Sequence, residues 1–108
     1  MSEVTFLSGE RTLTARISGE IDHHAAKDLR EKIDERMMSE RPTRLVLDFS
    51  GVGFMDSSGI GLVLGRAQRA EEQRATVRLI GLSDPIMRVV RLCGLERIKN
   101  LSVEYSRI

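Results

Sequence analysis

Residues 49–65 read FSGVGFMDSSGIGLVLG and connect an apolar, strand-like segment to a segment with helical spacing. The stretch holds five of the nine glycines of the chain. Gly59, Gly61 and Gly65 fall in or near the predicted helix, where each glycine costs about 1 kcal/mol relative to alanine. Three glycines are unusual in one helix, so we expect another part of the protein or a partner to approach this backbone closely.

Two explanations for these glycines are open. Gly61 and Gly65 lie four residues apart on one face, which would let the helix lie close to a sheet. Alternatively, Gly59 leaves the hydroxyl of the neighbouring serine open to a partner.

The segment Asp56-Ser57-Ser58 also has two open interpretations. Each of these side chains is a suitable N-cap for the helix, so capping alone accounts for their presence. A phosphoryl group at a helix N-terminus, however, meets unpaired backbone N–H groups and the positive end of the helix dipole. Either serine would therefore carry a phosphoryl group without unfolding the domain.

The segments before this stretch predict a hairpin followed by a helix. Residues 4–7 and 11–17 have strand character, and alternation in the second strand indicates one solvent-exposed face. Residues 23–39 show helical spacing, with Asp22 as a suitable N-cap. The apolar positions of this helix are Ala26, Leu29, Ile33 and Met37.

The remaining segments continue the alternation of strands and helices. Residues 44–49 form an almost continuous apolar run, typical of a central strand covered on both faces, and residues 50–56 are predicted as a loop. The further predicted elements are a helix over 57–72, a strand over 76–80, a short helix capped by Asp84 with Pro85 at its first position and closed by Gly94, and an edge strand over 101–105. We therefore predict an α/β fold in one domain, residues 1–108, with a small mixed β-sheet of four to five strands, an N-terminal hairpin and three to four helices.

Composition excludes several classes of function. The 17 Lys and Arg against 16 Asp and Glu give a net charge of +1, and the chain has one Tyr, three Phe and no Trp. This combination argues against direct binding of nucleic acid. At this length the chain buries about two-thirds of its surface, which disfavours an enzyme with a large cofactor. The sequence contains no apolar stretch of the ~20 residues that cross a membrane and no signal-peptide pattern, so we expect a cytoplasmic protein.

The chemical motifs that this stretch superficially resembles all fail on inspection. A P-loop needs Gly-Lys-Ser/Thr, but the chain has no lysine between Lys32 and Lys99. A dinucleotide fingerprint needs its third glycine at Leu64, and a hydrolase elbow needs glycine two residues before the serine. No third group is visible to activate Ser58 as a nucleophile. We therefore predict no enzymatic activity, no catalytic residue and no cofactor.

Other reactive or charged side chains are predicted to be structural. His23 and His24 are adjacent, so on a helix they point in different directions and do not serve one metal site. Cys93 cannot form an internal disulfide, and its position on the face of Ile86, Val89 and Val90 predicts a buried side chain. The charged runs 27–36 and 66–78 are predicted to be solvated helix faces.

Two separate stretches carry a resemblance to a known family. Residues 17–30 read ISGEIDHHAAKDLR and residues 54–66 read FMDSSGIGLVLGR. With them, the chain resembles from end to end the bacterial anti-sigma factor antagonists, the small stand-alone members of the STAS domain family. Within that family it is most similar to the sporulation antagonists that act on the anti-sigma-F factor.

The resemblance implies a regulatory switch rather than an enzyme. In this family the unphosphorylated antagonist binds an anti-sigma factor that is also a serine kinase, and so frees the sigma factor. The kinase phosphorylates the antagonist with ATP, which weakens the complex, and a serine phosphatase removes the phosphate. By position the phosphorylated serine falls on Ser58 and the family's acidic residues fall on Asp22 and Asp56. The partner-binding residues are expected to be Asp22, Asp56, Ser57, Ser58, Gly59 and Gly61. An alternative within the fold is a STAS module that senses a ligand or scaffolds a signalling complex without a phospho-switch.

Overall fold

A computed structural model describes residues 2–105, which form one five-stranded mixed sheet with the order β1-β2-β3-β4-β5. The strands are β1 (Ser2–Ser8), β2 (Thr12–Ile21), β3 (Arg44–Met55), β4 (Thr76–Ile80) and β5 (Leu101–Val103). The helices are α1 (His23–Glu40), α2 (Ser57–Glu72) and α3 (Asp84–Leu92), followed by a 3₁₀ turn, Leu95–Arg97. Strand β1 pairs antiparallel with β2 as an N-terminal hairpin, whereas the other neighbours are parallel. The predicted α/β class, mixed sheet and hairpin are confirmed.

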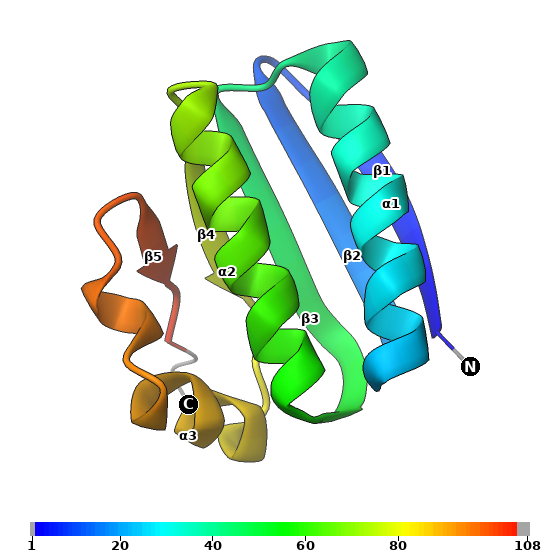
Figure 1. The fold of residues 1–108 in the computed structure, drawn as a ribbon, viewed down its shortest axis with the longest axis vertical. Helices are drawn as coiled ribbons and strands as arrows, with labels where there is room; N and C mark the ends of the chain where they lie inside the picture. The colour runs from blue at the N-terminus through cyan, green and yellow to red at the C-terminus, as the bar shows by residue number, and fades with distance from the viewer. Residues whose placement is uncertain (1, 106–108) are drawn as a thin grey trace.

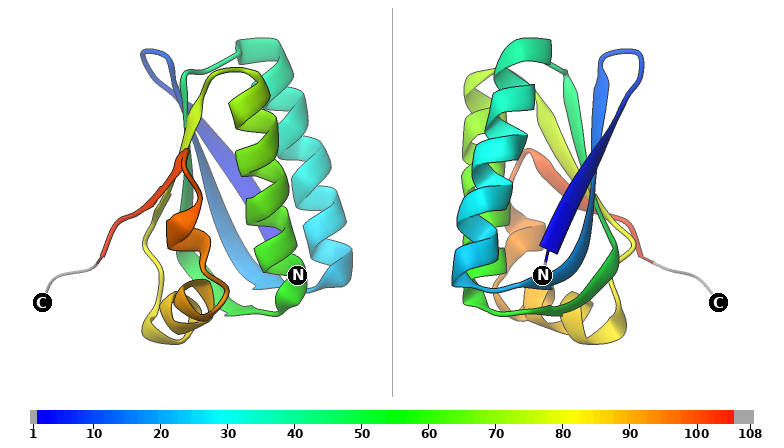
Figure 2. Two further views of the ribbon diagram at one scale, coloured as in Figure 1. Left: turned by 60° about the vertical axis from the view of Figure 1, so that its left-hand side comes forward. Right: turned by 90° about the vertical axis from the view of Figure 1, so that its right-hand side faces the viewer.

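The two long helices lie side by side on one face of the sheet (Figures 1 and 2). Leu29, Ile33 and Met37 of α1 are fully buried against the alternating apolar residues of β2 and β3. The prediction that residues 44–49 are covered on both faces holds only in part: on the face away from the long helices Arg44 is exposed and Val46 half-buried, whereas Asp48 is buried. No helix within residues 2–105 is long and apolar enough to cross a membrane.

Strand β3 continues well beyond its predicted end at Phe49. Residues 50–55 are part of the strand and not a loop, and they pair with the end of β2 through two irregularities in register. A Cβ at Gly51 would lie 3.0 Å from the Ile17 carbonyl oxygen, so the glycine permits a close approach of the two strands. Glycine in this segment therefore indicates tight strand pairing, although the same residue type is typical of loops.

The C-terminal third differs from the prediction in its details. Ser83, not Asp84, stands at the N-cap of α3, without a side-chain hydrogen bond. Cys93 is exposed at the end of that helix, so its predicted burial is wrong. The helix stops at Leu92, and Leu95 of the following 3₁₀ turn takes the buried place instead. Strand β5 occupies the predicted edge of the sheet but is two residues shorter than expected.

Candidate functional site

The N-termini of α1 and α2 lie next to each other because the strands before them are paired. Ile21 at the end of β2 is in register with Met55 at the end of β3. Each strand is followed by an aspartate, Asp22 or Asp56, and then at once by its helix. The Asp56 N–H donates a hydrogen bond to the Ile21 carbonyl at 3.2 Å, which joins the two turns directly. The two sequence motifs thus meet at one edge of the sheet.

Both aspartates cap their helices: Asp22 as predicted, and Asp56 as one of the three candidates that the sequence left open. Oδ1 of Asp22 accepts a hydrogen bond from the Ala25 N–H at 2.9 Å, and Oδ1 of Asp56 accepts one from the Ser58 N–H at 2.8 Å. The Ala25 N–H lowers the pKa of the Asp22 carboxyl below its ordinary value, because it stabilises the charged form. Asp22 is therefore ionised at neutral pH.

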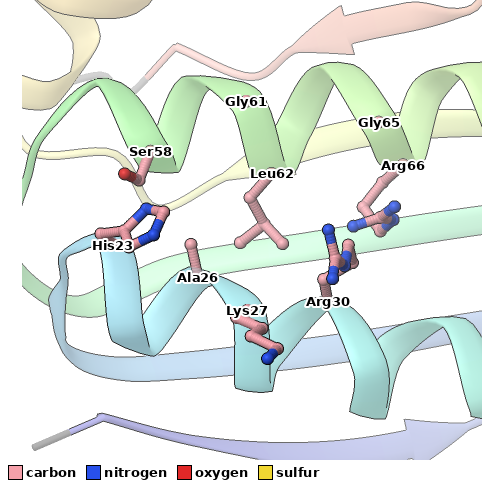
Figure 3. Close-up of a pocket in the computed structure, with 9 residues that line it drawn as sticks. All are labelled: His23, Ala26, Lys27, Arg30, Ser58, Gly61, Leu62, Gly65 and Arg66. Carbon is pink, nitrogen blue, oxygen red and sulfur yellow. The ribbon is translucent and has the colours of Figure 1, made fainter.

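Because Asp56 takes the capping role, the hydroxyls of Ser57 and Ser58 are left uncommitted. Within residues 2–105 neither hydroxyl has a hydrogen-bond partner, and the bond between Ser58 and Asp56 is donated by the Ser58 backbone N–H. Ser57 is exposed at the first position of α2. Ser58 is half-buried, and its side chain lies on the side of α2 that faces α1, close to His23 (Figure 3). The two adjacent serines therefore differ in their surroundings: Ser57 faces solvent, whereas Ser58 faces the helix α1.

A groove of about 550 Å³ runs between α1 and α2 and begins at Ser58. From α1 it is lined by His23, Ala26, Lys27 and Arg30, and from α2 by Ser58, Gly61, Leu62, Gly65 and Arg66 (Figure 3). These two sets follow helical spacing, which is the signal in the sequence that would have predicted the groove. The three basic residues among them, Lys27, Arg30 and Arg66, were predicted only as parts of solvated helix faces.

Of the two explanations left open for the glycines of α2, the structure does not support the close approach of Gly61 and Gly65 to the sheet. A Cβ at Gly61 or Gly65 would meet nothing within 4 Å, so these residues do not bring the helix close to the sheet; they line the groove. The close approach occurs at Gly59, which is buried and whose Cβ position is filled by the Met55 side chain. Gly59 is thus required by the packing of Met55 inside the domain. Partner binding by Gly59 and Gly61 stays a prediction.

Arg66 is buried, although its charged run was predicted to be solvated. Only 5% of the residue is exposed, and its Nε lies 2.9 Å from Oδ1 of Asp34 on α1. Burial lowers the pKa of Arg66 and the nearby Asp34 carboxylate opposes that shift. Arg66 and Asp34 therefore connect the two helices at the far end of the groove.

The paired histidines are both exposed, and only His23 lines the groove. Among residues 2–105, no three His, Cys, Asp or Glu side chains are grouped so that they would hold a metal ion.

Comparison with known proteins agrees with this arrangement. The STAS domain model matches residues 4–105. The chain is 37% identical over 84 residues to the anti-sigma F factor antagonist of Lysinibacillus sphaericus, covering 78% of this chain and 72% of that protein. It is 30% identical over 95 residues to the anti-sigma-B factor antagonist of Bacillus subtilis, covering 88% and 85%.

Solved structures show the same fold. The phosphorylated form of the Bacillus cell fate determinant SpoIIAA has a TM-score of 0.73 at 30% identity, covering 96% of this chain and 93% of that one. The unphosphorylated form of the anti-sigma factor antagonist SpoIIAA has a TM-score of 0.72 at 28% identity, covering 96% and 90%. The resemblance found in the sequence is confirmed: the chain belongs to the STAS domain family, among the anti-sigma factor antagonists.

Proposed function

We propose that the unphosphorylated chain binds an anti-sigma factor with serine kinase activity and so releases a sigma factor, and that phosphorylation of Ser58 switches this binding off. The observation that carries the proposal is Ser58, whose hydroxyl takes no part in the cap and whose side chain lines the groove between α1 and α2. In this role the chain is a substrate of the kinase and not an enzyme. A serine phosphatase resets the switch in the cytoplasm.

The surroundings of Ser58 favour a phosphate-dependent change in binding. Phosphorylation adds a charge of about −1.5 to −2 to a helix N-terminus, where the backbone tolerates an anion. Asp56 already provides a carboxylate two residues away. Two unit charges ~6 Å apart repel by ~0.7 kcal/mol in water and ~3 kcal/mol at an effective dielectric of 20. Since 1.4 kcal/mol corresponds to about tenfold in affinity, this repulsion together with the volume of the phosphate is enough to weaken a protein complex.

A relative supports the same step. The similar protein SpoIIAA occurs in both an unphosphorylated and a phosphorylated form. We assign the corresponding modification of this chain to Ser58, because its DSSG motif stands at the start of α2. The contact surface we propose consists of Asp22, Asp56, Ser57, Ser58 and Gly61, with the buried Gly59 supporting it from below.

Incubation with the anti-sigma factor encoded in the same genome and ATP, followed by phosphopeptide mapping, tests the proposal. We expect phosphate on Ser58, persistent binding by Ser58→Ala and weak binding by Ser58→Asp. If Ser58→Asp bound as tightly as the wild type, the charge-based switch would be wrong. Tight binding without any phosphorylation would favour the alternative of a scaffolding or ligand-sensing STAS module.

A further inference from the structure

The groove between α1 and α2 is positively charged along its length. Of its nine lining residues, which all lie in the described part of the chain, the ionisable ones are His23, Lys27, Arg30 and Arg66, and none is acidic. Arg30 and Arg66 extend toward each other from opposite helices (Figure 3). Like charges are normally kept apart on a surface, since their repulsion destabilises the fold. Their convergence here therefore needs an explanation.

Nearby carboxylates do not balance this charge. Asp34 lies 2.9 Å from the Nε of Arg66 and is shared with Arg69, whose Nε is 3.7 Å from the same oxygen. Nη1 of Arg66 is buried and has no hydrogen-bond partner within residues 2–105, whereas Nε is held in the ion pair with Asp34. One carboxylate thus faces two guanidinium groups, those of Arg66 and Arg69, and Arg30 adds a further positive charge close to Arg66. A buried nitrogen without a hydrogen-bond partner is rare in folded proteins and needs an explanation.

The shape of the groove suits a segment of another protein. Its volume of about 550 Å³ is that of a small-ligand site, and it is open to solvent along one side. Gly61 and Gly65 stand one helical turn apart and leave room for an incoming backbone or side chain. The opposite wall offers the small Ala26. A polynucleotide is a poor fit, because the whole chain has a net charge of only +1 and three Phe with one Tyr to stack on bases.

We propose that this groove receives an acidic segment, rich in Asp or Glu, of the anti-sigma factor, and that phosphate on Ser58 displaces this segment. The proposal rests on the function proposed above. Ser58 stands at one end of the groove, so a phosphoserine at that position introduces negative charge beside the same cations. It repels the incoming carboxylates and neutralises part of the charge that attracts them. Phosphorylation therefore weakens the electrostatic attraction between the basic groove and the acidic segment.

The test measures binding of the anti-sigma factor in a Ser58→Ala background, in which the kinase cannot modify residue 58. The double variant Lys27→Glu/Arg30→Glu reverses two exposed charges of the groove and is expected to bind at least about tenfold more weakly, with a reduced dependence on salt. Arg44→Glu/Arg97→Glu is the matched control, because both residues are exposed and lie outside the groove. It is expected to bind like the parent. Equal affinity of the two double variants would overturn the proposal.

A second variant tests the shape of the groove without changing its charge. Gly61→Leu places a side chain into open space on a helix, so the domain is expected to fold and the groove to be obstructed. Binding is expected to fall well below that of Gly61→Ala. Unchanged binding by Gly61→Leu would contradict occupation of the groove.

A titration that needs no anti-sigma factor separates the two proposals. Hexaglutamate added to the isotope-labelled chain is expected to shift the amide resonances of Gly61 and Gly65, whereas hexaglutamine is not. If the anti-sigma factor fails to bind even the wild-type chain, the proposed function is wrong. The titration then tests by itself whether the groove binds an acidic peptide. Shifts at Gly61 and Gly65 support such binding, and their absence overturns it. Larger shifts with inorganic phosphate than with hexaglutamate at equal charge would overturn the acidic-segment proposal in favour of a phosphate site.

Discussion

The Met55 side chain fills the space that a Cβ at Gly59 would need. Met55 is the last residue of β3 and Gly59 lies in the first turn of α2, so this contact sets how closely the helix starts beside the strand. Gly59→Ala is expected to lower the free energy of unfolding by about 1–3 kcal/mol, because overpacking outweighs the gain in helix propensity of about 1 kcal/mol. Urea denaturation of the two proteins measures the difference.

A double-mutant cycle identifies the cause. If Met55 is the obstacle, Gly59→Ala combined with Met55→Ala is less destabilising than the sum of the single variants. Additive effects would show that Gly59 is required for another reason.

At Gly61 and Gly65 of the same helix, substitution by alanine is expected to stabilise the domain instead of destabilising it. Because nothing lies within 4 Å of either Cβ position, Gly61→Ala and Gly65→Ala are expected to stabilise the domain by about 0.5–1 kcal/mol each. Thermal denaturation checks this, and the expected shift is to higher temperature. A destabilising Gly65→Ala would mean that the groove closes more tightly than the structure shows.

The cap of α2 can be separated from the charge at its N-terminus. Asp56→Ala removes the acceptor for the Ser58 N–H and is expected to cost about 1 kcal/mol of stability, whereas Asp56→Asn retains an acceptor and costs less. The comparison is made by chemical denaturation at neutral pH. Equal losses for both variants would point to the charge of the carboxylate and not to the cap.

At α1, Asp22→Asn retains the cap and removes the charge. Phosphorylation of this variant by the kinase distinguishes the two roles of Asp22. A slower reaction would indicate that the kinase recognises the carboxylate, and an unchanged rate would leave Asp22 as a cap alone.

Asp48 makes stability depend on pH. Burial alone would raise the pKa of Asp48, but hydrogen bonds from the Ser50 N–H and hydroxyl, together with Arg16, lower it below its ordinary value. A carboxyl with a lowered folded-state pKa contributes stability above its unfolded pKa, and this contribution is lost as pH falls through the folded pKa. Asp48→Asn is therefore expected to cost about 1–3 kcal/mol at neutral pH.

The difference between wild type and Asp48→Asn is expected to be constant above about pH 5 and to shrink as pH falls below about 4. Unfolding measured across this range tests the expectation, with exposed Glu20→Gln as a control. If the difference in unfolding free energy between the two proteins stayed constant down to the lowest pH, ionised Asp48 would not be its cause.

The neighbouring serines are expected to respond differently to a negative charge. Ser58 lines the groove, whereas exposed Ser57 does not. Ser58→Asp is expected to weaken binding of the anti-sigma factor by about tenfold or more, and Ser57→Asp to have a much smaller effect. Calorimetric titration of each variant gives the two affinities, and equal losses would mean that the charge acts without regard to the groove.

The parts of the fold that could be predicted are those in which local chemistry and tertiary structure agree. The apolar spacing of Leu29, Ile33 and Met37 predicted the buried face of α1, and Asp22 and Asp56 were recognised as caps because their hydrogen bonds are local. Both sequence motifs of the candidate site were found, and the structure places them at one edge of the sheet.

Prediction failed where a residue depends on a distant neighbour. In the sequence Gly51 is typical of a loop, and only the structure shows that β2 packs directly against it. Cys93 has the spacing of a buried position, but the helix ends one residue earlier and Leu95 fills the core. Arg66 belongs to a charged run, and only the packing of α1 against α2 shows that it is buried.

The hydrogen bond between the Asp56 N–H and the Ile21 carbonyl has a wider consequence. Because it joins turns from two distant parts of the chain, the surface around Ser58 is a conformational epitope that exists only after β2 and β3 have paired. A linear peptide that spans residues 50–70 would carry the DSSG motif without its α1 wall. If the proposed function holds, a partner that contacts both walls binds the folded domain and not an unfolded or nascent chain, which would restrict regulation to molecules that have completed folding.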